Sequence, residues 1–235
     1  MSRSNPQTNA PNPAVRFFEW NGEHGTIRYY DKEKKENVTV GSEFQFLLLD
    51  QLGTVGGWHD ESDSGIYANE VRDTRRDVLI VKAFKAGTLV EGVYRSIKDR
   101  VHALGGQFVA NCYIGFKNGH GLEIGSIKFK GAALNAWVEF GKANRAALYK
   151  KALAIKGFEE GKKGRIVYRV PAFETRELSE DTNAQAVELD KQLQAFLADY
   201  LQRTTKEQVP EDAHEHYEPP TPSTAQPLTD DDIPF

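Results

Sequence analysis

The stretch from Phe108 to Phe129 reads FVANCYIGFKNGHGLEIGSIKF, which is two apolar, β-prone runs separated by Asn118-Gly119. Asparagine followed by glycine adopts positive φ readily, so this pair suits a tight reversal between antiparallel strands. The two runs, 108–116 and 122–129, therefore predict a β-hairpin.

Similar short runs occur on both sides of this hairpin. They are rich in β-branched and aromatic residues and are interrupted by Gly, Asn and Asp, which favours a mainly antiparallel β fold, a barrel or a sandwich. These further runs lie at 15–20, 26–30, 37–40, 43–49, 65–71, 78–84 and 165–170. Apolar residues at helical spacing predict helices over 92–104 and about 132–143, and Gly161–Gly164 predicts a second reversal.

The two ends of the chain differ in composition from its middle. Residues 1–13 are rich in Ser, Asn and Pro and predict a disordered leader, and the acidic, proline-bearing residues 204–235 predict a disordered tail. Between the body at 14–178 and this tail, leucines and aromatics at three- and four-residue steps predict an amphipathic helix over 179–203. That helix would dock on the body or on a second copy of the chain, so a homo-oligomer stays open.

Charge is distributed unevenly along the 235 residues. The net charge is -4, yet residues 1–170 carry 26 bases and 19 acids, whereas residues 204–235 carry eight acids and only Lys206. A basic body with an acidic tail suggests a polyanion-binding domain that carries its own competing polyanion. The lone Cys112 and the absence of a long apolar run favour a cytoplasmic protein without a membrane span.

The last six residues combine three carboxylates, Asp230, Asp231 and Asp232, with an apolar Ile233-Pro234-Phe235 ending. A basic-rimmed apolar pocket on a partner could receive the Phe235 ring and the terminal carboxylate, while the aspartates lie along lysines and arginines. An acidic tail that served only solubility would gain nothing from this hydrophobic terminus.

This terminus resembles the C-terminal tip of bacterial-type single-stranded DNA-binding proteins. In that family the tip is the docking peptide for replication, recombination and repair enzymes, and an OB-fold domain holds the DNA. The resemblance implies an OB-like DNA-binding body over 14–178. It also gives Asp230, Asp231 and Asp232 as the acidic approach, Ile233 and Pro234 as contacts, and Phe235 as the anchor. A body unlike the usual bacterial domain suits a bacteriophage-encoded protein.

Binding of unpaired strands requires flat rings for bases and cations for phosphates. Period-two alternation of strand residues indicates which rings share a face with cations, and projecting loops supply further cations. The candidate contacts are Arg16, Phe18, Trp20, Arg28, Tyr30, Arg75, Arg76, Tyr113, Lys117, Lys128, Lys130, Lys162, Lys163, Arg165 and Arg169.

Two other functions remain alternatives. The run His59–Asp63 gathers one imidazole and three carboxylates, which could serve a metal-dependent nuclease recruited by the same tip, although a hydrophilic loop is the simpler interpretation. A protein-binding adaptor without DNA affinity is the other alternative. The sequence shows no zinc-ligand spacing and no phosphate-binding loop, so we expect no cofactor, no metal and no catalytic residue.

Overall fold

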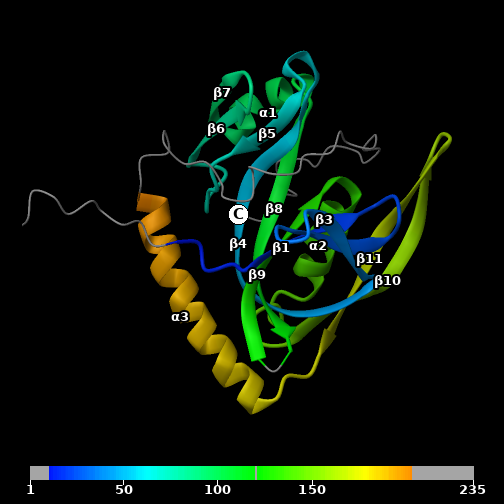
Figure 1. Cartoon of the computed structure of the whole chain (residues 1–235), viewed down its shortest axis with the longest axis vertical. Helices are drawn as coiled ribbons and strands as arrows, with labels where there is room; N and C mark the ends of the chain where they lie inside the picture. Colours follow the sequence, from blue (N-terminus) through cyan, green and yellow to red (C-terminus); the bar gives the residue numbers. More distant parts are fainter. Residues whose placement is uncertain (1–10, 120, 203–235) are drawn as a thin grey trace, which may run out of the picture.

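A computed structural model describes residues 11–119 and 121–202 (Figure 1). Most of the predicted leader, the predicted tail and the Asp230–Phe235 tip lie outside these described residues.

The predicted hairpin is confirmed. Strand β8 (Gly106–Asn118) and strand β9 (Gly121–Lys130) are antiparallel, and their register runs from Val109 opposite Lys130 to Asn118 opposite Gly121. Gly119 has φ +60°, the left-handed conformation that glycine adopts without strain.

The chain is mainly β, as predicted. The other strands are β1 (Arg16–Asn21), β2 (Thr26–Asp31), β3 (Glu36–Gly41), β4 (Glu43–His59), β5 (Ser64–Ala68), β6 (Val78–Ala83), β7 (Gly87–Val93), β10 (Ala152–Lys163) and β11 (Ile166–Arg176). The helices are α1 (Tyr94–Ala103), α2 (Gly131–Ala143) and α3 (Glu180–Gln202), with a 3₁₀ turn, η1 (Asp60–Ser62).

Several boundaries differ from the sequence prediction; the strand predicted at 65–71 ends at Ala68, and the strand predicted at 165–170 extends to Arg176. The strand predicted at 43–49 extends to His59, because β8 and then β5 supply it with hydrogen-bond partners through its glycines. The predicted helix 92–104 begins at Tyr94, and the residues before it form β7. The second reversal lies at Gly164-Arg165, since β10 continues through Gly161, whose backbone faces the ring of Tyr168.

One mixed sheet joins the strands in the order β3-β2-β1-β9-β8-β4-β5-β6-β7, and β1 is parallel to β9. The start of β4 also pairs with β10, and β10 pairs with β11. The amide of Arg169 on β11 donates to the carbonyl of Gly22 at 2.7 Å, and the indole N–H of Trp20 donates to the carbonyl of Arg169 at 2.9 Å. The sheet therefore curls until β11 meets the β1–β2 turn.

The inner face of this curl holds an aromatic core. Trp137 of α2 is buried and stacks on Phe129 of β9, with ring centroids 5.2 Å apart. Its indole N–H donates to Oε1 of the buried Gln51 at 2.7 Å. The polar atom of the largest core side chain is thereby satisfied, which burial in an apolar interior requires.

Helix α3 lies along the opposite, outer face of β4, β8 and β9 (Figure 1). Leu193 and Leu197 are fully buried there, and the hydroxyl of Tyr200 accepts a hydrogen bond from the backbone N–H of Glu70 at 3.1 Å. The predicted C-terminal helix is confirmed, and its apolar stripe packs on the body of its own chain.

Within residues 11–119 and 121–202, none of the helices combines the length and the apolar character needed to cross a lipid bilayer.

Candidate nucleic-acid interface

Strand register groups four of the predicted contacts on a part of the sheet's outer face that lies beyond α3. In one row Asn111 of β8 pairs with Lys128 of β9, Lys128 with Glu19 of β1, and Glu19 with Arg28 of β2. Directly paired residues point to the same side of a sheet, and so do residues two apart on one strand. Lys130 and Tyr30 therefore share this face. We call Arg28, Tyr30, Lys128 and Lys130 the outer-face row.

One carboxylate lies within this row. Glu19 stands between Lys128 and Arg28 in register, and its Oε1 is 2.6 Å from Nε of Arg28. The side chains of Arg28 and Glu19 are 22% and 36% exposed, so the pair orients the guanidinium more than it stabilises the fold. The carboxylate of the buried Glu70 also lies at this face, because it accepts a hydrogen bond from the side chain of Asn111. Three cations and two acids leave a small excess of positive charge here.

The rings of Phe18, Trp20 and Tyr113 are not available to stack on bases, contrary to the sequence prediction. All three are at most 5% exposed. Phe18 lies between the rings of Phe44 and Phe116, at centroid distances of 4.9 and 5.0 Å. The period-two alternation of strand residues correctly predicts that Phe18 and Trp20 share one face of β1, but that face is the inner one.

Tyr113 fails for a different reason. It lies on the outer face, where α3 covers it, and its hydroxyl donates to Oε2 of the buried Glu70 at 2.9 Å. Alternation identifies the face of a strand residue but does not show what packs on that face.

Arg16 and Lys117 lie away from the outer-face row. The Arg16 guanidinium is 4.9 Å from the ring centroid of Tyr29 and 5.6 Å from that of Phe116, which is an inner-face contact. Lys117 is exposed near the end of β8, whereas Lys130 pairs with Val109 near the beginning of β8.

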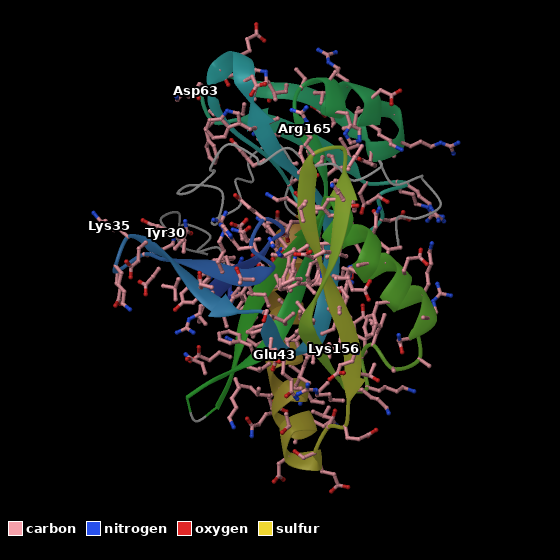
Figure 2. The ribbon with its side chains drawn as sticks, turned by 90° about the vertical axis from the view of Figure 1, so that its right-hand side faces the viewer. Tyr30, Lys35, Glu43, Asp63, Lys156 and Arg165 are labelled. Atoms are coloured by element: carbon pink, nitrogen blue, oxygen red, sulfur yellow. The ribbon has the colours of Figure 1, made fainter. Side chains whose placement is uncertain are left out.

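A second cationic group lies at the tip of the β10–β11 hairpin. Lys162, Lys163 and Arg165 are exposed there, and Figure 2 shows Arg165 at the tip, separated from Tyr30 and Lys35 on the β2–β3 hairpin. The tip also exposes Ile166 by 38% and Val167 by 45%. A projecting two-stranded ribbon with cations and apolar side chains can contact both phosphates and bases.

Arg169 anchors this hairpin instead of joining its tip. Its Nη2 lies 3.1 Å from Oε1 of Glu160, and its guanidinium sits 5.4 Å from the ring centroid of Phe158. Phe158 and Arg169 also fill the space beside Gly25, where a Cβ atom would come within 2.5 Å of the Phe158 ring.

Arg75 and Arg76 are exposed on the loop between β5 and β6. Asp73 orders this loop, because Oδ1 accepts the backbone N–H of Arg75 at 2.9 Å and Oδ2 lies 3.6 Å from Nε of Arg76. These two arginines stay candidates as loop cations.

Sequence reasoning missed three rings, Trp58, Tyr67 and Phe84, and the neighbouring Lys82. Trp58 was overlooked because β4 was predicted to end too early. The others lie in predicted strands whose alternate residues, such as Ile66, are fully buried. That alternation is the signal that could have marked Tyr67 as a residue facing away from the core.

The possible nuclease loop has ordinary structural roles. His59 Nδ1 is 2.7 Å from the Ser62 hydroxyl, and Asp63 lies 3.8 Å from the ammonium group of Lys85. In the parts of the chain that the structure describes, no three His, Cys, Asp or Glu residues are placed to hold a metal ion. Complete burial, together with the charge of Asp50, raises the pKa of Cys112 well above its usual value, so this thiol is a poor nucleophile.

Comparison of the chain with protein-family models, with curated proteins and with solved structures found no match.

Proposed function

We propose that this protein binds single-stranded DNA without strong sequence preference and recruits replication, recombination or repair enzymes through Asp230–Phe235. The observation that carries the proposal is the gathering of Arg28, Tyr30, Lys128 and Lys130 on one face of the sheet. Cations that meet phosphates release condensed counterions, and the exposed part of the Tyr30 ring stacks on an unpaired base. A strand held in this way cannot re-pair.

Strand connectivity supports an OB-like fold for the body, residues 14–178. The long β4 pairs with both β8 and β10, and the chain runs from β4 through hairpin β8–β9, helix α2 and hairpin β10–β11. Five-stranded OB barrels bind oligonucleotides on their second and third strands and on the loops after the first and fourth. If β4 is taken as the first strand, the second and third strands are β8 and β9. The loop after the first strand is then the segment from β5 to α1, which we call the insertion, and the loop after the fourth strand is the tip of the β10–β11 hairpin. The departure is β1, which occupies the position beside β9.

A binding measurement with the full-length chain tests this function. We expect a mobility shift on an oligo-dT strand at low salt, weaker binding to duplex DNA of equal length, and affinity that falls steeply as salt rises. Failure to bind oligo-dT at low salt would leave the adaptor function in its place. Cleavage of the strand with magnesium or manganese, abolished by changes at Asp60, Glu61 and Asp63, would support the nuclease.

Removal of Phe235 alone is expected to weaken binding to an enzyme that docks on the tips of bacterial single-stranded DNA-binding proteins by about thirtyfold or more. An aromatic anchor in a desolvated pocket carries about 2 kcal/mol or more of binding free energy. Isothermal titration of purified enzyme with the full-length and shortened chains measures this loss. Thr229→Ala, just outside the tip, is the matched control. Unchanged enzyme affinity after loss of Phe235 would refute recruitment by the tip.

A further inference from the structure

The outer face continues beyond α3 onto the end of β4 and onto β5 and β6. Trp58 pairs with Gly65, Gly56 pairs with Tyr67, and Tyr67 pairs with Lys82. Because paired residues point to the same side, Trp58, Tyr67 and Lys82 share the outer face. Phe84 follows directly, since its backbone N–H donates to the carbonyl of Gly65 at 3.2 Å. We call Trp58, Tyr67 and Phe84 the ring cluster.

The ring cluster points away from the core. The ring centroids of Tyr67 and Phe84 are 4.6 Å apart with an interplanar angle of 31°. Phe84 is 38% exposed, and Trp58 and Tyr67 are partly exposed, while the residues on the other side of β5, Ile66 and Ala68, are fully buried. Glycine opposite both Trp58 and Tyr67 contributes no side chain that could cover them. Three adjacent, partly exposed rings on one face suit a ligand with flat apolar surfaces.

Cations lie next to these rings. Lys82 stands beside Tyr67 in register, and the ammonium group of Lys85 donates to the backbone carbonyl of Asp63 at 2.8 Å. Asp63 offsets the charge of Lys85, because its carboxylate is 3.8 Å away. Lys82 and Lys85 therefore place two cations at this end of the face, one of them beside Asp63.

The ring cluster and the outer-face row belong to one surface. Tyr67 and Lys130 are separated by three strand spacings, from β5 through β4 and β8 to β9, which corresponds to about 14 Å. The outer-face residues between them are uncharged: Thr54, Gly56, Gln107 and Val109. A negatively charged strand would therefore meet lysines at both ends of this path. The carboxylate that lies beside the path, Glu70, is buried and accepts hydrogen bonds from Asn111 and Tyr113.

We propose that the ring cluster is a stacking platform for unpaired bases of the strand whose phosphates contact Lys128 and Lys130. This inference rests on the proposed function and adds to it a base-binding site on the insertion between β4 and β8. Bases stack on such rings whatever their identity, so the platform increases affinity without adding sequence preference. The competing explanation is that the rings only shield the backbone around Gly56 and Gly65.

Tryptophan fluorescence reports directly on this site. Of the three tryptophans, Trp20 and Trp137 are 5% and 2% exposed within the core, so Trp58 is the one that a ligand can reach. We expect oligo-dT to quench the fluorescence of the full-length protein. Trp58→Phe should abolish the quenching while a mobility shift still shows binding. Quenching of equal size in Trp58→Phe would overturn the proposal.

A comparison of two strands separates stacking from charge. Phe84→Ala is expected to weaken binding to oligo-dT by on the order of tenfold, and to leave binding to an abasic strand of equal length unchanged. Phe84→Trp should restore the affinity for oligo-dT. Val187→Ala removes a side chain of α3 that is 46% exposed and serves as the control. Melting temperatures of all variants show whether each one folds.

The outcomes distinguish the two proposals. If the wild-type chain fails to bind oligo-dT, the proposed function is wrong. If the wild-type chain binds but Phe84→Ala binds both strands as the wild type does, only the stacking platform is wrong. An equal loss on oligo-dT and on the abasic strand would also overturn the platform, because the abasic strand offers no base to stack.

Discussion

Gly105→Ala is expected to lower the free energy of unfolding by about 3 to 5 kcal/mol, which is exceptional for a single methyl group. Gly105 has φ +85°, and a Cβ atom there would stand 2.1 Å from the carbonyl oxygen of Trp58. The neighbouring Gly57 is equally restricted, since its Cβ would come 2.2 Å from the carbonyl oxygen of Gly105. Two backbone segments meet at this point, so neither a rotamer change nor a small shift relieves the collision.

Gly87→Ala is the matched control for this variant. Gly87 has a similar φ of +72°, yet no atom lies within 4 Å of its would-be Cβ. Its substitution should cost only the left-handed backbone penalty of about 1 to 2 kcal/mol. Urea unfolding of the full-length variants measures both losses. If Gly105→Ala and Gly87→Ala lower the free energy of unfolding equally, the close approach of Trp58 and Gly105 does not constrain the backbone where the insertion joins the sheet.

The double variant Lys128→Gln/Lys130→Gln is expected to bind oligo-dT at least about tenfold more weakly at low salt. Each lost phosphate contact on a single strand should also reduce the slope of log affinity against log salt by about 0.7, or about 1.4 for two contacts. Fluorescence titrations at several salt concentrations provide both quantities. Glutamine retains most of the aliphatic stem, so the change removes charge more than packing.

Lys142→Gln/Lys151→Gln is the control with the same change of charge. Lys142 lies in the last turn of α2 and Lys151 lies just before β10, so both are away from the outer-face row. Their side chains are 50% and 41% exposed. Equal effects of the two double variants would mean that net charge alone, and not the outer-face row, determines affinity.

Local signals in the sequence predicted local structure well. Asn118-Gly119 between two β-prone runs predicted the β8–β9 hairpin, and the apolar stripe near the C-terminus predicted α3. Each depends on residues close together in the chain. The alternation of Ile127 and Phe129 with Lys128 and Lys130 likewise predicted correctly which side of β9 faces the core.

Long-range pairing could not be predicted from such signals. No local pattern shows that β1 lies parallel to β9 or that α3 covers Tyr113, because both depend on segments far apart in the sequence. The same limitation explains the buried candidates Phe18 and Trp20. Aromatic residues beside cations occur both in cores and in binding sites, and only tertiary contacts distinguish the two.

The parallel pairing of β1 with β9 also affects how the chain is synthesised. Arg16 pairs with Gly125, so the first strand emerges from the ribosome more than a hundred residues before its partner. At about 5 to 20 residues per second, that interval is on the order of five to twenty seconds. During it Phe18 and Trp20 lack their final neighbours, which makes the nascent chain a natural client for chaperones that shield aromatic segments.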